Sequence, residues 1–121
     1  MSIEEFYAEL DSVDPGSLVI VEGINDMKAL RKLGLDCSIL PINKRPLYQV
    51  VEKAAGRGKQ TVLLVDLDKE GRKLYRYLYH HLTRHGVKID NRFRRYLFRT
   101  PVREIENLYG FIRNLSPYNF M

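Results

Sequence analysis

Short apolar runs alternate along this chain with longer segments in which apolar positions recur every three or four residues. Three of the runs, Leu18–Glu22, Cys37–Leu40 and Thr61–Asp66, are rich in Val, Ile and Leu and have the length of strands. Continuous apolar runs of this kind are typical of parallel strands that are buried on both faces. The pattern therefore predicts a buried parallel sheet whose strands are connected by helices.

The segments between these runs have the periodicity of amphipathic helices. Ser2 and Glu5 form a capping box before an N-terminal helix, and Thr100 followed by Pro101 predicts the start of a last helix. Three more helices are predicted around residues 26–33, 46–55 and 71–85. The chain thus alternates strands with helices, which indicates the α/β class.

A fourth strand is expected after the helix that ends near residue 85. Either Val87–Ile89 or Tyr96–Phe98 could form it, and both alternatives stay open. We predict a four-stranded parallel sheet in the order 2-1-3-4 with helices on both faces, because crossovers between parallel strands are right-handed. This order makes the strands that end at Glu22 and Asp66 neighbours.

The length of 121 residues fits one domain, residues 1–121, with an acidic N-terminal helix at 1–14 and a core at 18–121. No apolar stretch approaches the roughly 20 residues of a membrane helix, and Glu4 and Glu5 stand where a signal peptide would be basic. We therefore expect a cytoplasmic protein with no membrane partner. Cys37, the single cysteine, lies in an apolar run and is expected to be buried.

The formal net charge of +5 is distributed unevenly. The segment from Met1 to Asp14 has five acidic residues and no Lys or Arg, whereas the segment from Lys69 to Arg103 has 11 basic residues against two acidic ones. Clustered Arg and Lys bind a phosphate backbone favourably because they release its counterions. The asymmetry indicates a nucleic-acid partner; a solvated basic surface is the alternative.

Two acidic signatures follow the first and third apolar runs. They are Glu22-Gly23 with Asp26 three residues on, and Asp66-Leu67-Asp68 with Gly71 three residues on. Because parallel strands end at the same edge of a sheet, these carboxylates should meet there, and residues two apart on a strand point the same way. Carboxylate oxygens favour hard cations, so we predict a Mg²⁺ site, in which Mn²⁺ could substitute. The alternative is local: Asp26 and Asp68 would only cap helices.

Together the two signatures resemble the Toprim domain of type IA topoisomerases, bacterial-type primases, overcoming-lysogeny-defect nucleases and the small ribonucleases that mature ribosomal RNA precursors. The resemblance covers the chain from about Leu18 onward and implies a Rossmann-like sheet. It also implies that Asp66 and Asp68 bind the metal, and that Glu22 binds it too or acts as a general acid or base. Gly23, Asp26 and Gly71 would support this site.

Basic residues next to these signatures are the candidates for phosphate contacts. They are Lys44, Arg45, Lys69, Arg72 and Lys73, and Arg92, Arg94, Arg95, Arg99 and Arg103 could extend a track for the nucleic-acid strand. Ordinary solvent-facing side chains are the alternative for each of them.

Three functions are compatible with these features. The first is metal-dependent cleavage or transfer of nucleic-acid phosphodiesters, most similar to the small ribonuclease branch. The second is a noncatalytic accessory module that binds nucleic acid, and the third is a primase-like protein, although 121 residues leave no room for the flanking regions that primases normally use. RNA or DNA as substrate, a protein partner and the oligomeric state stay open.

Overall fold

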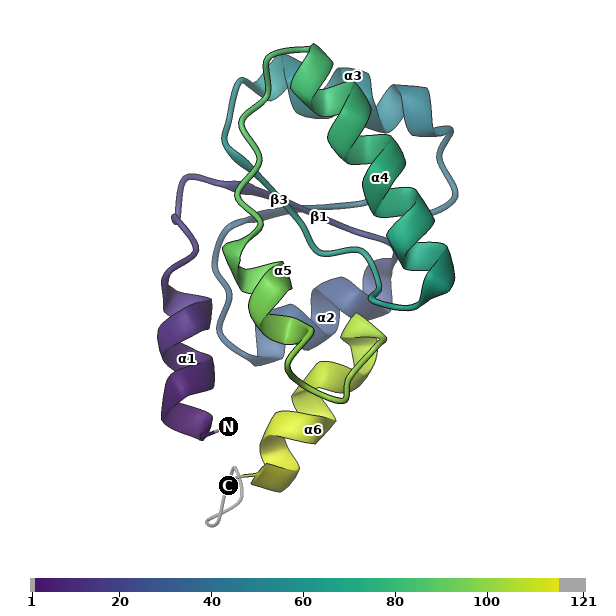
Figure 1. The fold of residues 1–121 in the computed structure, drawn as a ribbon. Coiled ribbons are helices and arrows are strands. Elements are labelled where there is room, and N and C mark those ends of the chain that lie inside the picture. Colours follow the sequence, from purple (N-terminus) through teal and green to yellow (C-terminus); the bar gives the residue numbers. More distant parts are fainter. Residues whose placement is uncertain (1, 116–121) are drawn as a thin grey trace.

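A computed structural model describes residues 2–115, in which a three-stranded parallel sheet is enclosed by helices (Figure 1). The strands are β1 (Leu18–Val21), β2 (Ser38–Pro41) and β3 (Thr61–Leu63), in the order β2-β1-β3. The helices are α1 (Ile3–Asp11), α2 (Ile24–Lys32), α3 (Leu47–Arg57), α4 (Lys69–Arg84), α5 (Arg92–Leu97) and α6 (Leu108–Leu115), with a short 3₁₀ helix, η1 (Ile105–Asn107), before α6.

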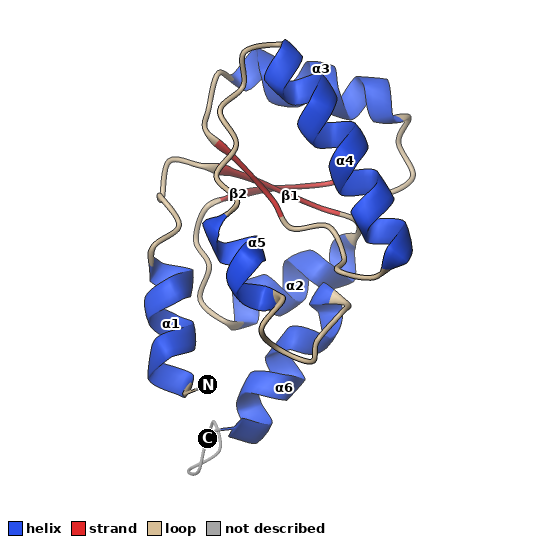
Figure 2. Cartoon of the chain, in the orientation of Figure 1, coloured by secondary structure: helices blue, strands red, loops and turns tan. Residues whose placement is uncertain are grey.

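The central strand β1 is buried on both faces because helices cover both sides of the sheet (Figure 2). Val19 and Val21 pack with residues of α1, α2, α5 and α6, whereas Leu18 and Ile20 pack with residues of α3 and α4. Alternate side chains of a strand point to opposite faces, so one apolar strand supplies both cores. The predicted α/β class, parallel sheet and two-sided helical cover are confirmed.

The predicted fourth strand is not found within residues 2–115. Tyr96 and Leu97 belong to α5 and Phe98 caps it, so the alternative Tyr96–Phe98 is wrong. Phe93, Tyr96 and Leu97 are buried and are spaced three and four residues apart, so a helix brings all three to one face and a strand would not. The other alternative, Val87–Ile89, contributes only an isolated parallel bridge between Ile89 and Thr61. The described sheet therefore has the order 2-1-3, without the fourth position.

The last helix begins later than the Thr100-Pro101 signal predicted. The Thr100 hydroxyl donates to the Leu97 carbonyl oxygen (2.7 Å) and accepts from the Val102 N–H (3.2 Å), so it closes a turn and caps no helix. The chain then passes along the edge of the sheet, where the Leu67 N–H donates to the Arg103 carbonyl oxygen (2.7 Å). This tertiary contact outweighs the local signal for a helix start.

Two further features of residues 2–115 bear on the expectations above. Cys37 is buried, as predicted, with 3% of its surface exposed. None of the described helices combines the length and the apolar character needed to cross a membrane.

Candidate acidic site at the sheet edge

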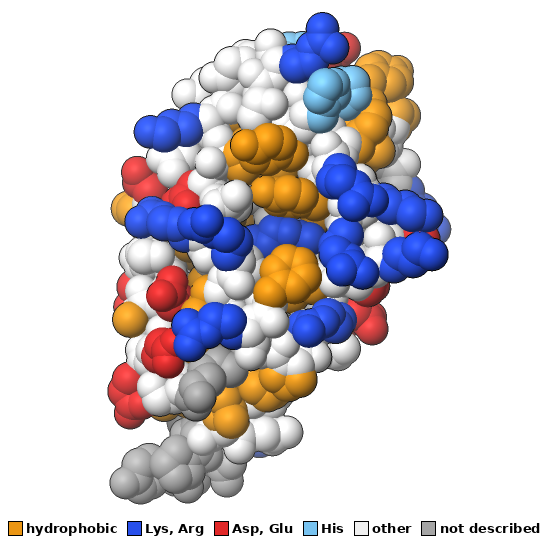
Figure 3. Space-filling view, in the orientation of Figure 1, with side chains coloured by type: hydrophobic (Ala, Val, Ile, Leu, Met, Phe, Trp, Pro, Cys, Tyr) orange, Lys and Arg blue, Asp and Glu red, His pale blue; other side chains and the backbone are white. Residues whose placement is uncertain are grey.

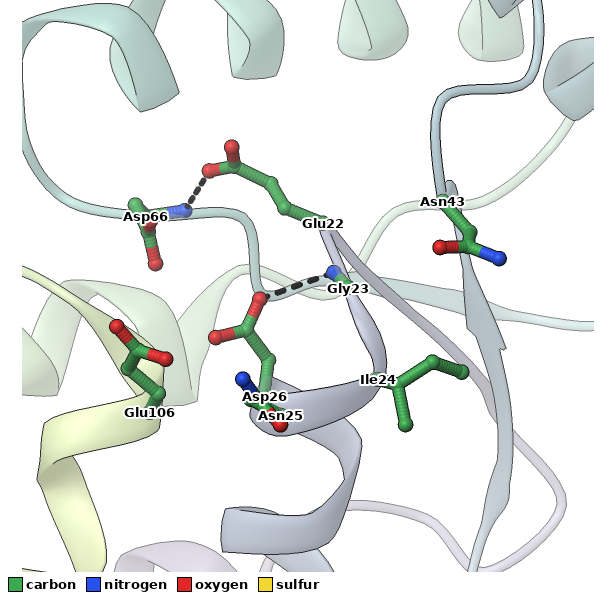
Figure 4. Close-up of a pocket in the computed structure, with 8 residues that line it drawn as sticks. All are labelled: Glu22, Gly23, Ile24, Asn25, Asp26, Asn43, Asp66 and Glu106. Atoms are coloured by element: carbon green, nitrogen blue, oxygen red, sulfur yellow. Dashed lines mark hydrogen bonds between the residues drawn. The ribbon is translucent and has the colours of Figure 1, made fainter.

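A pocket of about 410 Å³ lies where β1 and β3 come to an end, and four carboxylates line it (Figure 4). Its lining residues are Glu22, Gly23, Ile24, Asn25, Asp26, Asn43, Asp66 and Glu106. Two of these acids, Glu22 and Asp66, follow neighbouring parallel strands, as the sequence predicted. Asp26 comes from the first turn of α2, and Glu106 from η1.

Glu22 and Asp66 are joined directly across the end of the sheet. The Glu22 Oε2 atom accepts a hydrogen bond from the backbone N–H of Asp66 (2.7 Å). The Asp66 carboxylate points toward η1, where its Oδ1 atom accepts from the backbone N–H of Ile105 (2.9 Å) (Figure 4). Each acid is therefore held by a segment that is distant in sequence, and Asp66 anchors η1 to the sheet.

Asp26 has a capping role in addition to its place in the pocket. Its Oδ2 atom accepts from the backbone N–H of Gly23 (3.0 Å), the N-cap residue of α2, and this is the half of a capping box that a glycine N-cap allows. The prediction that Asp26 caps this helix is confirmed in its hydrogen bond, but not in its position, because the N-cap residue is Gly23 and Asp26 is the third residue of α2. The side chain is only 7% exposed, and burial, reinforced by the charge of Asp66, raises its pKa to about 6.

Asp68 lies differently from the expectation that it shares a strand with Asp66. Strand β3 ends at Leu63, so the alternation that would align the two side chains does not reach them. The Asp68 Oδ1 atom instead accepts from the backbone N–H of Gly71 (2.8 Å) and caps α4. Asp68 is absent from the pocket lining, although its charge contributes to the raised pKa values of Glu22 and Asp66. A metal role for Asp68 stays a prediction.

Gly71 is required for close packing between α4 and the acidic segment. A Cβ atom at this position would lie 2.0 Å from the Asp66 carbonyl oxygen and 2.8 Å from its Cα atom. At Gly23, by contrast, a Cβ atom would meet nothing within 4 Å. Steric contact with Asp66 therefore explains why residue 71 is a glycine, whereas no such contact explains the glycine at position 23.

The sequence did not predict that Glu106 lines the acidic pocket or that Arg94 supports the backbone beside it. Glu106 lies 40 residues from Asp66, and no local motif links the two. Arg94 was expected to contact phosphate, but it is only 3% exposed and its guanidinium donates to the carbonyl oxygens of Val65 and Asp66, the latter at 3.0 Å. Arg94 thus supports the backbone that carries Asp66.

The other predicted phosphate-binding residues lie outside the acidic pocket. Lys44 is exposed in a left-handed turn, Arg45 is half-buried, and Lys69 begins α4 at the surface. Lys73 forms an ion pair with Glu70 (3.6 Å), and Arg72 lines a second cavity described below. Of the longer track, Arg92 and Arg99 form ion pairs with Asp90 (2.9 Å) and Glu5 (3.1 Å), and Arg103 donates to two backbone carbonyls.

The pocket has an excess of negative charge. Glu22, Asp26 and Asp66 all have a raised pKa, first because they are buried and then because other carboxylates lie nearby. Among the described residues, no Lys or Arg side chain lines this pocket. Backbone N–H groups and the nearby Arg94 offset this repulsion only in part, since the pKa values remain raised, and a bound cation would relieve it further.

A family model described as the Toprim domain matches residues 17–100, which include the parallel sheet and the Glu22, Asp26 and Asp66 side chains of the acidic pocket. The UPF0292 protein of Methanocaldococcus jannaschii is 31% identical over 98 residues, which cover 78% of this chain and 77% of the relative. The UPF0292 protein of Pyrococcus abyssi is 35% identical over 101 residues, which cover 81% and 76%. The chain therefore belongs to the UPF0292 family of Toprim-domain proteins.

A solved structure has a similar fold. A protein from Aquifex aeolicus superimposes with a TM-score of 0.75 and 28% identity, over 86% of this chain and 95% of that one. The Toprim resemblance predicted from the two signatures is thus confirmed. The nearness to the small ribonuclease or primase-like branch stays a prediction, because these relatives define the family and no branch.

Toprim domains typically bind Mg²⁺, and the donor set of the acidic pocket fits that ion chemically. All four acids offer hard oxygen ligands, and the described lining residues include no Cys, Met or His, whose sulfur or nitrogen atoms would favour a softer metal. Within residues 2–115, however, no three His, Cys, Asp or Glu side chains are close enough together to hold a metal. Coordination by Glu22, Asp66 and Asp68 would therefore require these side chains to reorient.

Proposed function

We propose that this protein is a Mg²⁺-dependent enzyme that cleaves or transfers phosphodiester bonds of nucleic acids, with Glu22, Asp66 and Asp68 as its catalytic and metal-binding residues. The observation that carries the proposal is the gathering of Glu22, Asp26, Asp66 and Glu106 in one pocket with no lining cation among the described residues. Such a pocket favours a divalent ion, and that ion would attract phosphate groups.

Each acid would have a distinct part in the chemistry. Asp66 and Asp68 would hold the ion, which when bound stabilises charge on phosphoryl oxygens and lowers the pKa of a coordinated water. Glu22, which accepts a hydrogen bond from the Asp66 backbone N–H, would contact the ion or transfer a proton at the scissile phosphate. Asp26 and Arg94 would maintain the site, because one caps α2 and the other holds the Asp66 carbonyl.

The test is cleavage of labelled hairpin RNA, single-stranded RNA and duplex DNA with Mg²⁺ or with EDTA. We expect products only with Mg²⁺, and a reaction slowed by about 100-fold or more for Asp66→Asn. Asparagine keeps an oxygen that can accept from the Ile105 N–H, so this variant should fold like the wild type. The exposed acid Glu52, on α3, supplies the matched control Glu52→Gln, which should cleave normally.

A thermal-shift measurement checks the metal independently of turnover. Mg²⁺ should raise the melting temperature of the wild type and of Glu52→Gln, because an ion that binds the native state stabilises that state. The melting temperature of Asp66→Asn should not rise, because this variant lacks a ligand of the ion. Full activity in EDTA, or unimpaired activity of Asp66→Asn, would contradict the proposal.

A second candidate function is a noncatalytic module that binds nucleic acid. One observation favours it: Glu22, Asp26, Asp66 and Asp68 each accept a hydrogen bond from a backbone N–H, so all four have structural roles without a metal. For this candidate we expect binding of the labelled substrates without metal-dependent products, and equal binding by the wild type and Asp66→Asn.

A further inference from the structure

A second cavity, of about 240 Å³, lies between α4 and α5, on the side of the Asp66 backbone where Arg94 lies. We call it the arginine–aromatic groove. Figure 3 shows this face of the molecule, with hydrophobic side chains between groups of Lys and Arg. The groove is lined by Arg72, Tyr75, Arg76, Asn91, Arg94, Arg95 and Phe98.

Arg94 forms the floor of the groove between two aromatic rings. Its guanidinium carbon lies 4.5 Å from the centre of the Tyr75 ring and 5.4 Å from the centre of the Phe98 ring. The rings come from different elements, since Tyr75 lies on α4 and Phe98 caps α5. Phe98 is 39% exposed, which is a large exposure for an aromatic side chain beside a cavity. Tyr79 also stacks on the Tyr75 ring (ring centres 5.8 Å apart), and the Arg103 guanidinium lies 5.9 Å from the centre of the Phe98 ring. The groove thus offers a ligand the exposed part of Phe98 and the partly exposed Tyr75 beside a fixed cation.

The rim of the groove is cationic. Arg72, Arg76 and Arg95 are exposed, and within residues 2–115 none of them forms an ion pair. No acidic side chain is among the described lining residues. A groove with four arginines and no lining acid is complementary to a polyanion. Asn91 adds an amide that can both donate and accept hydrogen bonds, as recognition of a base edge requires.

We infer that the arginine–aromatic groove binds an unpaired nucleotide of a single-stranded nucleic acid, with its base packed against the exposed part of Phe98, beside Tyr75, and its phosphates on the arginine rim. The inference builds on the proposed function and specifies its substrate class. Paired bases are stacked inside a duplex and cannot reach these rings, whereas unpaired bases stack readily on aromatic and guanidinium planes. The cavity is smaller than the roughly 300–1,000 Å³ of pockets for drug-sized ligands, so one base fits it better than a larger group.

The groove is also connected to the acidic site. The guanidinium of Arg94 lines the groove and donates to the carbonyl oxygen of Asp66 (3.0 Å). A nucleotide bound in the groove would therefore place the neighbouring stretch of its backbone near the Asp66 segment. The preferred substrate is then a strand with at least one unpaired base next to the bond that reacts.

Binding measured by fluorescence anisotropy in EDTA tests this inference without turnover. The ligands are a labelled single strand of about 12 nucleotides, in RNA and DNA forms, the same strand annealed to its complement, and an abasic strand of equal length. We expect Phe98→Leu to weaken binding of both normal single strands by about 10-fold or more. Its binding of the duplex and of the abasic strand should stay within about twofold of the wild type.

Tyr48→Leu is the matched control, because Tyr48 is an aromatic residue of α3 that is 58% exposed and lies outside the groove. It should bind every ligand like the wild type. Unchanged binding of single strands by Phe98→Leu would overturn the inference, and so would an equal loss with the abasic strand. If poly-glutamate competes as well as the single strand and its binding also depends on Phe98, the groove binds an acidic protein segment instead.

The failures of the two proposals are distinguishable. Single-strand binding that depends on Phe98, without Mg²⁺-dependent cleavage, would leave the groove assigned and remove the catalytic proposal. Cleavage that depends on Asp66 but not on Phe98 would support the catalytic proposal and remove the assignment of the groove.

Discussion

Replacing Gly71 by alanine should destabilise the protein, although alanine is the better helix former. The added Cβ atom would lie 2.0 Å from the Asp66 carbonyl oxygen, whereas ordinary contacts begin at 3.4 Å, so the two segments must separate by about 1.4 Å. Such a shift would disturb the hydrogen bond from the Gly71 N–H to Asp68 and the one from the Asp66 N–H to Glu22. Overpacking of a tight site costs about 1–3 kcal/mol, and a lost helix cap about 1 kcal/mol more.

We therefore expect the free energy of unfolding of Gly71→Ala to fall by roughly 2–4 kcal/mol. Urea unfolding followed by far-ultraviolet circular dichroism, without divalent ions, measures this quantity. The matched control is Gly56→Ala, because Gly56 lies on α3 and its Cβ atom would meet nothing within 4 Å. The control should gain up to about 1 kcal/mol from helix propensity. If Gly71→Ala came within about 0.5 kcal/mol of the wild type, the close approach of α4 to Asp66 would be refuted.

Two further predictions concern the acidic site and its support. Without divalent ions, the free energy of unfolding should rise as the pH falls from about 6 toward 4, because Asp26 has a pKa of about 6 when folded against an ordinary 3.8, so the folded protein binds more protons in that range. Urea midpoints across this range should show a flatter profile for Asp26→Asn; an unchanged profile would exclude Asp26 as the source. Arg94→Leu should lose about 2–4 kcal/mol of stability, because it leaves the carbonyl oxygens of Val65 and Asp66 without their donor. The exposed neighbour variant Arg95→Leu should lie within about 0.5 kcal/mol of the wild type, and equal losses for the two variants would contradict the bracing role of Arg94.

The sheet and the position of Glu22 and Asp66 could be predicted because they depend on local pattern and strand parallelism. Apolar runs of four or five residues identify buried strands, and parallel strands end at one edge. The pairing of β1 with β3 then brings Glu22 next to Asp66. The general location of the acidic pocket thus followed from the sequence.

The remaining features depend on contacts that a local pattern does not contain. Helix α5 has six residues, too few to separate helical from strand periodicity, so the Tyr96–Phe98 segment could be read as a strand. Thr100-Pro101 is a typical helix start, but the segment that follows it forms hydrogen bonds with Leu67 and Asp66 beyond the end of β3. The last α-helix therefore begins only at Leu108. Glu106 was missed, and Arg94 was assigned to phosphate binding instead of to support of the Asp66 backbone, because tertiary contacts alone bring them to the site.

The hydrogen bond from the Ile105 N–H to the Asp66 carboxylate makes this amide a built-in spectroscopic reporter of the site. Any event that withdraws electron density from the Asp66 oxygens, such as protonation or ion coordination, weakens the bond. The nitrogen-15 chemical shift and the hydrogen-exchange rate of Ile105 should therefore follow the state of Asp66 in solution. Occupancy of the pocket can thus be titrated at one backbone resonance, on a residue that carries none of the chemistry itself.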